Sequence, residues 1–340
     1  MQAALFKPGG KLEVSDRPTP KPGPGEVLVK VAYCGICGSD LHLLDSGFLP
    51  PDAILGHELS GHIAGLGPGV EGWAEGEAVV VMPGDPCLVC EPCRNGQTQI
   101  CQEGLDRAYG LGKNPGAFSQ YMLVKPKTLY RIPEGLDLVT AALTEPWAVG
   151  RHGVNLLNLT HCSPILVMGA GPIGLMCVYA LNSLGISDVV VSEPDPFRAG
   201  LAKAAGASLV LDPRAANPAA VIRERTGRLP ASVMDCVGSS SSLREAMGFA
   251  GPRGLVVVLG LHLGKVSLQP FIGFSKELQI KFSYAYNTLE FGESLTLLAR
   301  GAVEPKVIIS EVLPLREIAS AFRLLRETGH SKIILDCQAA

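Results

Sequence analysis

Residues 165–174 read ILVMGAGPIG, an apolar run followed at once by three closely spaced glycines. An apolar run of this length predicts a buried strand, and a GxGxxG pattern directly after it predicts a tight turn into a helix. Gly169 would permit the turn, Gly171 would let the backbone approach a pyrophosphate, and Gly174 would let strand and helix pack closely. The stretch therefore predicts the dinucleotide-binding turn of a strand–helix–strand unit.

The residues after this turn indicate which dinucleotide binds. Pro172 and Ile173 open the predicted helix, whose free N–H groups and positive dipole end would face the phosphates. Glu193 directly ends the next apolar strand, so its carboxylate would accept hydrogen bonds from the adenosine ribose. A 2′-phosphate would be repelled there, which favours NAD over NADP. Asp195 is the alternative ribose acid, and Arg198 either covers the adenine or faces solvent.

Strand and helix signals alternate beyond the turn, with further strands expected in DVVVSE, SLVLD, SVMDCV, LVVVLG and ELQIKFSY. Strands that alternate with helices predict a parallel sheet covered on both faces, the doubly wound α/β fold. No Asp, Glu, Lys or Arg occurs between Arg151 and Asp188. A buried strand followed by a packed helix explains that stretch better than a membrane span, because prolines and asparagines interrupt it.

The bulk composition excludes several function classes. With 340 residues, 47% apolar and 18% charged, the chain predicts two domains with ample cores rather than disorder. A net charge of −3 without a basic cluster argues against nucleic-acid partners. The N-terminus, MQAALFKPGGK, lacks the apolar region of a signal peptide. Ten cysteines without an export signal then indicate a reducing compartment, the cytoplasm.

Four cysteines, Cys87, Cys90, Cys93 and Cys101, follow the spacing Cys-x2-Cys-x2-Cys-x7-Cys. Short cysteine loops supply the four soft ligands that tetrahedral zinc requires. The segment between them holds few apolar residues, so a metal is needed to organise it. Two disulfides are the alternative, which the close spacing of the first three cysteines and the missing secretion signal both oppose.

A second set of ligand types lies in the first 150 residues, which read as mainly β. Catalytic zinc keeps three protein ligands and an open fourth position. Cys37 and His57 are the natural first two ligands, because a thiolate candidate precedes a histidine flanked by glycine and a carboxylate. The third ligand is either Glu58 or Glu145.

The segments CGICGSDLH, GHE, the four-cysteine lobe and GAGPIG occur in that order over most of the chain. In them the chain resembles the zinc-dependent medium-chain dehydrogenases, the group of alcohol, sorbitol, threonine and butanediol dehydrogenases. The resemblance implies a GroES-like β-rich catalytic domain with a structural zinc lobe over 1–148. It also implies a Rossmann domain over 149–284 and a C-terminal segment over 285–340 that completes the catalytic domain.

Matched residue by residue, the resemblance implies a role for each candidate ligand. Cys37 and His57 would coordinate the catalytic zinc, and Asp40 would hold the His57 imidazole through its other nitrogen. Glu58 follows the sorbitol and threonine dehydrogenase pattern, in which this glutamate can ligate. Glu145 occupies the position of a third cysteine in animal alcohol dehydrogenases. We expect both Glu58 and Glu145 to serve the catalytic zinc.

The activity inferred is reversible oxidation of a secondary alcohol by NAD⁺, with one catalytic and one structural zinc per chain. Ser39 would accept the alcohol proton, and the ribose hydroxyls of the coenzyme would pass it to His42, three residues further along the same helix face. Alternatively, Ser39 is the helix N-cap and His42 a surface histidine. The alternative functions, an NADP-linked zinc-free reductase and a non-catalytic homologue, are opposed by the intact ligands and Glu193.

The substrate is less well indicated. Candidate pocket residues, which are also candidate core residues, are Leu44, Phe48, Tyr109, Phe118 and Trp147. Sorbitol dehydrogenases carry an arginine–tyrosine pair after a late phenylalanine, whereas this chain has Phe282-Ser283-Tyr284. The missing arginine argues against a plain sorbitol enzyme and leaves polyols, diols, cyclitols and amino alcohols open. ELQIKFSY is a candidate edge strand of the sheet. The resemblance implies that such edges pair between copies, which gives a homodimer or homotetramer.

Overall fold

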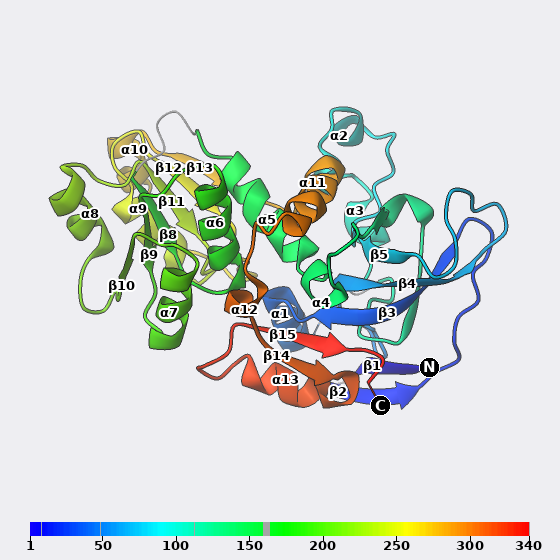
Figure 1. The fold of residues 1–340 in the computed structure, drawn as a ribbon. Coiled ribbons are helices and arrows are strands. Elements are labelled where there is room, and N and C mark those ends of the chain that lie inside the picture. Colours follow the sequence, from blue (N-terminus) through cyan, green and yellow to red (C-terminus); the bar gives the residue numbers. More distant parts are fainter. Residues whose placement is uncertain (8, 48, 112, 159–163, 340) are drawn as a thin grey trace. The chain divides into compact units, whose positions relative to one another are not determined.

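The computed structural model describes residues 1–7, 9–47, 49–111, 113–158 and 164–339, which form two compact units (Figure 1). The first unit comprises Met1–Glu145, Tyr286–Gly301 and Ile309–Ala340, and the second comprises Pro146–Ala285 and Ala302–Ile308. The sequence placed the domain boundaries at 148 and 284, close to these. The C-terminal part is more divided than expected, because residues 302–308 belong to the second unit.

The first unit is built on antiparallel strands. Its main sheet has the order β14-β15-β3-β4-β5-β7, with β6 pairing β3, and β1 pairs β2 separately. Only the β14–β15 pair within it is parallel among the described strands. The strands are β1 (Gln2–Lys7), β2 (Lys11–Asp16), β3 (Val27–Gly35), β4 (Glu58–Leu66), β5 (Ala78–Val81), β6 (Tyr121–Val124), β7 (Leu129–Arg131), β14 (Ile309–Pro314) and β15 (Lys332–Asp336).

Helices of the first unit are mostly short. They are α1 (Gly38–Ser46), α2 (Glu91–Arg94), α3 (Gly104–Arg107), α4 (Leu138–Ala141), α11 (Thr288–Ala299) and α13 (Ile318–Leu324), with 3₁₀ turns η1 (Thr98–Ile100), η2 (Pro126–Thr128) and η3 (Leu315–Glu317). Helix α5 (Thr144–Asn155) begins in this unit and continues into the second. Phe322 of α13 and Leu335 of β15 pack into the same core as Val29 of β3. The C-terminal segment therefore helps to build the core of the first unit.

The second unit is a parallel sheet in the order β10-β9-β8-β11-β12-β13. The strands are β8 (Ile165–Met168), β9 (Val189–Ser192), β10 (Leu209–Leu211), β11 (Ser232–Asp235), β12 (Leu255–Val258) and β13 (Gln279–Phe282). The helices are α6 (Pro172–Ser183), α7 (Pro196–Ala204), α8 (Pro218–Thr226), α9 (Ser242–Phe249), α10 (Pro270–Lys276) and α12 (Pro305–Ile308). This confirms the predicted doubly wound α/β fold.

The apolar composition of the central strands explains this sheet. Every residue of β8, β9, β11 and β12 is buried, as strands covered by helices on both faces require. The chain leaves β8 in one direction for β9 and later returns on its other side as β11, so a switch point lies at the end of β8. Within the uncharged stretch before Asp188, residues 165–168 form β8 and residues 172–183 form α6, as expected. Among the described residues, every helix is too short or too polar to cross a bilayer.

Candidate metal centres and dinucleotide site

Three candidate ligands of the first unit lie together. Cys37 Sγ, a ring nitrogen of His57 and a carboxylate oxygen of Glu58 all lie within 4.8 Å of one another. Cys37 is the N-cap residue of α1, and His57 and Glu58 lead into β4 directly after Gly56, whose φ is +97°. A Cβ at Gly56 would also lie 2.6 Å from the Phe118 ring. Glycine at position 56 is therefore needed to bring the histidine to the group.

Asp40 links the start of α1 to the histidine. Its Oδ2 accepts a hydrogen bond from the Cys37 backbone N–H at 2.9 Å, and its Oδ1 lies 3.5 Å from His57 Nδ1. Burial alone would lower the pKa of His57, but Asp40 and the Cys37 thiol raise that pKa well above its ordinary value. Because Nδ1 faces Asp40, Nε2 is the nitrogen left to bind a metal. Thiolate, imidazole and carboxylate are a donor set that fits zinc.

Ser39 and His42 both lie on α1 but differ in exposure. Ser39 is half-buried, with its Oγ 3.5 Å from His57 Nε2, whereas His42 is exposed one turn further along. The N-cap alternative for Ser39 is wrong. Cys37 occupies the N-cap position, because the Asp40 side chain reaches back to its backbone N–H. The role of Ser39 and His42 in a proton relay stays a prediction.

Glu58 has a partner that the sequence did not reveal. Lys332 Nζ, at the start of β15, donates to both carboxylate oxygens of Glu58 at 2.6 and 2.7 Å and to the Ile36 carbonyl at 2.8 Å. Lys332 and Glu58 are almost completely buried. Gly35 makes the room, because a Cβ there would lie 2.1 Å from Glu58 Oε2. The only sequence signal was a lysine directly before the apolar run of residues 333–335 in β15.

Glu145 lies outside the group formed by Cys37, His57 and Glu58. Its Oε1 accepts a hydrogen bond from the Tyr286 hydroxyl at 3.0 Å, and both side chains are buried in the first unit. Burial raises the pKa of Glu145 to about 7. The Tyr286 ring stacks on Phe291 of α11 with 5.4 Å between centroids. Tyr286 is a second residue that the sequence analysis missed.

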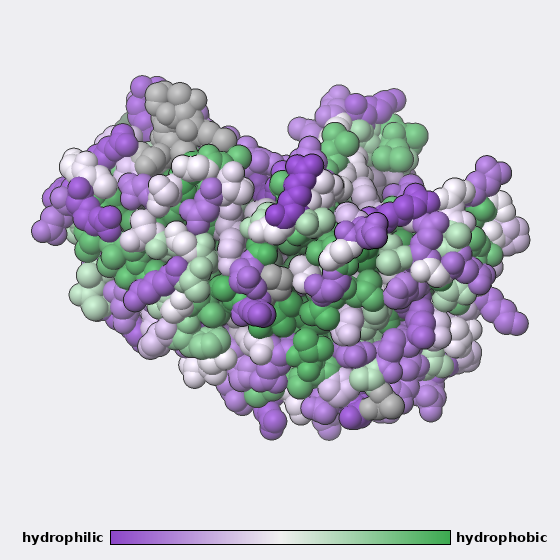
Figure 2. All heavy atoms as spheres, viewed as in Figure 1, coloured by the Kyte–Doolittle hydropathy of each residue, from purple (hydrophilic) through white to green (hydrophobic). Residues whose placement is uncertain are grey.

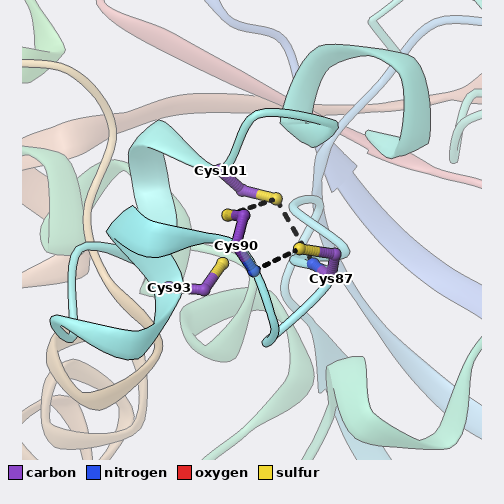
Figure 3. Close-up of side chains that lie close together, drawn as sticks. All are labelled: Cys87, Cys90, Cys93 and Cys101. Carbon is purple, nitrogen blue, oxygen red and sulfur yellow. Dashed lines mark hydrogen bonds between the residues drawn. The ribbon is translucent and has the colours of Figure 1, made fainter.

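The four lobe cysteines point toward one another (Figure 3). The Sγ atoms of Cys87, Cys90, Cys93 and Cys101 all lie within 4.8 Å of one another, and each of these cysteines is free. The two-disulfide alternative is therefore wrong. Backbone N–H groups, first that of Gln102, lower the pKa of Cys90 to about 6, whereas burial raises that of Cys93 to about 12. Four convergent thiols fit a closed tetrahedral zinc site.

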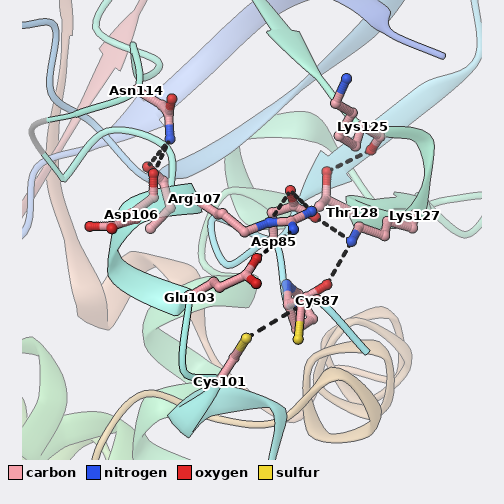
Figure 4. Close-up of polar contacts among 12 residues, drawn as sticks. Asp85, Cys87, Cys101, Glu103, Asp106, Arg107, Asn114, Lys125, Lys127 and Thr128 are labelled. Atoms are coloured by element: carbon pink, nitrogen blue, oxygen red, sulfur yellow. Dashed lines mark hydrogen bonds and ion pairs between the residues drawn. The ribbon is translucent and has the colours of Figure 1, made fainter. Parts of the chain in front are cut away.

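A buried carboxylate ties this lobe to the rest of the first unit (Figure 4). Asp85 lies two residues before the first lobe cysteine and accepts from Arg107 Nη2 at 2.9 Å and from Arg107 Nε at 3.1 Å. Lys127 Nζ lies 2.7 Å from Asp85 Oδ1 and also donates to the Pro86 carbonyl at 2.6 Å. Asp85 thus joins the root of the lobe to α3 and η2.

The glycine turn of the second unit has the shape that a dinucleotide requires. Gly169 has φ +87°, and a Cβ at Gly174 would lie 2.0 Å from the Gly169 carbonyl oxygen. A Cβ at Gly171 would meet no atom of the described chain within 4 Å, which leaves its outer side open to a ligand. Gly171 is the N-cap of α6, which Pro172 and Ile173 open. These features fit a bound pyrophosphate.

Glu193 lies beside this turn with its carboxylate held by the backbone. Its Oε2 accepts from Ala170 N–H at 2.7 Å and its Oε1 from Asp195 N–H at 2.8 Å. The Asp195 side chain is the N-cap of α7 and accepts from Arg198 N–H at 2.9 Å. The contact with Ala170 places Glu193 at the turn. The alternative acid Asp195 has a structural role as a helix cap.

Most of the candidate pocket residues belong to cores. Leu44, Tyr109 and Phe118 lie in the hydrophobic core of the first unit, and Trp147 is fully buried in the second. Their apolar surface is used in packing, as the core alternative expected, and a role in a substrate pocket stays a prediction. Phe48 lies outside the described residues.

Comparison with known families covers most of the chain. Residues 23–134 match the alcohol dehydrogenase GroES-like domain, and residues 172–300 match the zinc-binding dehydrogenase family. These matches fall on the segments that carry the Cys37–His57–Glu58 group, the lobe and the helix after the glycine turn.

Individual relatives align over nearly the whole length. The chain is 35% identical to 2-dehydro-3-deoxy-L-galactonate 5-dehydrogenase of Pseudoalteromonas atlantica, over 94% of this chain and 93% of that one. It is 31% identical to the sorbitol dehydrogenase of Bacillus subtilis, over 94% and 92%. A solved structure described as a zinc-binding dehydrogenase from Sinorhizobium meliloti, bound to NADP, superposes with a TM-score of 0.90 at 31% identity, covering 98% of each chain.

Proposed function

Since the chain belongs to the zinc-dependent medium-chain dehydrogenases and is an alcohol or polyol oxidoreductase, we propose that it oxidises a secondary alcohol reversibly with NAD⁺. The substrate class is a polyol, diol, cyclitol or amino alcohol. The observation that carries this proposal is the convergence of Cys37, His57 and Glu58 on one point at the start of α1 and β4.

Two zinc ions per chain fit the donor sets. Cys37 Sγ and His57 Nε2 would hold the catalytic ion, and Cys87, Cys90, Cys93 and Cys101 the structural one. Bound at Cys37 and His57, zinc supplies Lewis acidity that lowers the pKa of a coordinated alcohol. A metal at this group would also displace the proton from His57, because imidazole ligates in its neutral form.

Both glutamates serve the catalytic ion in this proposal, by different routes. Glu58 is within ligand reach, and its ion pair with Lys332 does not block it, because each carboxylate oxygen has a second lone pair. Glu145 would supply the carboxylate for the catalytic ion when Glu58 remains paired with Lys332. The Tyr286 hydroxyl orients Glu145 through one oxygen.

The second unit supplies the coenzyme site. The open side of Gly171 and the N-terminus of α6 receive the pyrophosphate, and Glu193 receives the adenosine ribose. Bound NAD⁺ supplies the nicotinamide that accepts hydride from the alcohol carbon. Arg198, in the first turn of α7, would cover the adenine in this proposal.

In this proposal the alcohol proton leaves by way of two side chains on α1. Ser39 Oγ, next to His57 Nε2, accepts the proton, and His42, exposed on the same helix, releases it to solvent. This order gives each residue the environment that its step needs: the acceptor beside the metal ligands and the donor at the surface.

We expect the enzyme to work as a homodimer or homotetramer in the cytoplasm. Strand β13 is the last strand of its sheet, and all four of its residues are exposed. A second copy would pair with that edge. The nine described cysteines are free, which agrees with a reducing compartment.

NADP-linked reduction is the second candidate function, favoured by the similar structure that was solved with NADP. The Cys37–His57–Glu58 group opposes a zinc-free version of it and also opposes a non-catalytic homologue. Coenzyme preference is therefore the property on which the two enzymatic candidates differ.

The purified protein tests the proposal directly. We expect two zinc equivalents per chain by metal analysis, and NADH absorbance with at least one member of a panel of polyols, diols, cyclitols and amino alcohols. Cys37→Ala should abolish turnover and lower the zinc content, while the far-ultraviolet circular dichroism spectrum stays that of the wild type. Substantial turnover by Cys37→Ala, or an active wild-type protein without zinc, would contradict the proposal.

A further inference from the structure

The carboxylate of Glu193 is a fixed negative charge beside the glycine turn. Its two oxygens accept from Ala170 N–H and Asp195 N–H, and the residue is buried, so the charge cannot swing aside for an incoming group. In dinucleotide-binding folds this position meets the adenosine ribose, and a nearby arginine is the usual means of accepting a 2′-phosphate. The residues around Glu193 therefore decide whether that phosphate is tolerated.

Arg214 is an arginine that lies close to Glu193. It follows β10, the strand next to β9, and its Nη2 donates to the carbonyl of Pro194, the residue directly after Glu193. The charges of Asp195 and Glu193 both act on its guanidinium. The side chain is largely exposed, so a ligand could reach it from solvent. A planar guanidinium with paired donors suits a phosphate.

Asp212 occupies the donors of this arginine. Arg214 Nε lies 2.9 and 3.2 Å from the two Asp212 oxygens, and Arg214 Nη2 lies 2.8 Å from Oδ2. The Arg214 backbone N–H also donates to Asp212 Oδ1 at 2.9 Å, which fixes both residues in one turn. Hydrogen bonds from the Arg214 side chain are the main reason that the pKa of Asp212 is lowered.

We propose that Asp212 determines coenzyme choice by holding Arg214, so that the Asp212–Arg214 pair is a latent site for the 2′-phosphate of NADP. The inference rests on the proposed function, because it assumes that the glycine turn binds a dinucleotide. With Asp212 in place, the guanidinium is neutralised and directed at Pro194, and the chain takes NAD.

The local charge supports this assignment. The acids Glu193, Asp195 and Asp212 and the arginines Arg198 and Arg214 leave a net charge of −1 around the ribose position. A dianionic 2′-phosphate is repelled by that balance. Removal of the Asp212 charge makes the cluster neutral and frees two guanidinium donors for the phosphate.

Asp212→Asn is the direct test, because asparagine keeps the oxygen that accepts from the Arg214 backbone N–H and loses only the ion pair. We expect the zinc-loaded, full-length variant to bind NADP⁺ about tenfold more tightly than the wild type, measured by isothermal titration calorimetry. The ratio of NADP⁺ to NAD⁺ affinity should rise by the same factor. The gain should shrink as sodium chloride is added, because exposed charges are screened.

Three further variants isolate the cause. The double variant Asp212→Asn/Arg214→Met should lose the gain, since methionine keeps length and removes the donors. Asp45→Asn is the matched control: it breaks the exposed two-point pair between Asp45 and Arg326 in the other unit and should leave the ratio unchanged. Asp212→Ser serves as a second single variant with the same expected direction.

The outcomes separate this inference from the proposed function. If the wild type binds NAD⁺ and neither Asp212 variant changes the affinity ratio, or the double variant keeps the gain, only the inference fails. A wild type that already prefers NADP⁺ also overturns it. If the wild type binds neither dinucleotide, the proposed function fails and the inference falls with it.

Discussion

The ion pair between Lys332 and Glu58 balances charge in the most buried part of the Cys37–His57–Glu58 group. Removing one partner of a buried pair destabilises proteins by about 3–5 kcal/mol, because the other charge is left without compensation. We expect Lys332→Met to lower the free energy of unfolding of the zinc-free protein by about 3–5 kcal/mol. Added Zn²⁺ should restore more stability to the variant than to the wild type, because the ion then compensates Glu58. Urea unfolding with and without Zn²⁺ measures both effects.

Two variants control for this result. Lys332→Arg keeps the positive charge and should show the wild-type response to Zn²⁺. Lys276→Met removes a lysine whose Nζ donates to the carbonyls of Met247, Gly248 and Ala250, so any loss of stability there should not depend on Zn²⁺. An identical zinc response in Lys332→Met and the wild type would show that Lys332 does not act on the metal group.

Individual site residues differ in how well sequence alone predicts them. That Cys37 and His57 lie together was predictable, because thiol and imidazole in short glycine-rich segments are typical zinc ligands. Lys332 and Tyr286 were not, because 274 residues separate Lys332 from Glu58 and 141 separate Tyr286 from Glu145. Lysine and tyrosine carry no ligand signature, and only the folded first unit brings them to their acids.

Among the elements, the four-cysteine lobe is the one that we expect to depend most on a bound metal. It exposes the apolar residues Leu88, Val89, Ile100 and Leu105. Figure 2 shows apolar surface over the lobe that carries α2. Side chains that would build a core thus face outward, and the cysteines occupy the centre. Zinc binding would then supply folding free energy that packing does not.

Cys93→Ala tests this dependence. We expect the variant to lose one zinc equivalent per chain and to be cleaved by trypsin near Arg94, because the lobe opens without its metal. Turnover per remaining catalytic zinc should change less than stability does. Cys337→Ala, which changes a buried cysteine outside both metal groups, should keep its zinc and resist trypsin. Full zinc content in Cys93→Ala would exclude the four-cysteine site.

Element by element, the second unit followed its sequence pattern more closely than the first. The run ILVM became β8 and the glycines opened α6, because apolar composition and the glycine turn both act locally. The start of α1 was less predictable: Ser39 is a usual N-cap residue, but Asp40 reaches back to Cys37. The N-cap residue therefore lies two positions before the expected Ser39, a shift that local preference does not reveal.

In the whole molecule, the least predictable feature is the return of residues 302–308 to the second unit. Helix α12 packs there against α7. A helix of four residues has no apolar period to read, and its place depends on a surface formed about a hundred residues earlier. The sequence therefore predicted one continuous C-terminal segment over 285–340. In the structure the chain instead passes into the second unit at residue 302 and back into the first at residue 309.

Assembly is the remaining property at this scale, and the edge strand β13 makes it testable. Phe282 is 70% exposed and Ile280 lies at the surface on the same strand, which is an unusual concentration of apolar residues on a sheet edge. Phe271 and Phe274 of the neighbouring α10 are also exposed and stack on each other. A second copy paired at β13 would bury these residues and extend the sheet.

The double variant Ile280→Lys/Phe282→Lys should therefore shift the protein from dimer or tetramer toward smaller species, as measured by sedimentation velocity over a range of concentrations. Lysines on an edge strand prevent pairing through repulsion between copies and the cost of burying their charge. Leu184→Lys changes an exposed leucine just after α6 and should leave the assembly intact. If the double variant keeps the wild-type mass, the interface lies elsewhere, and the apolar edge at β13 has another explanation.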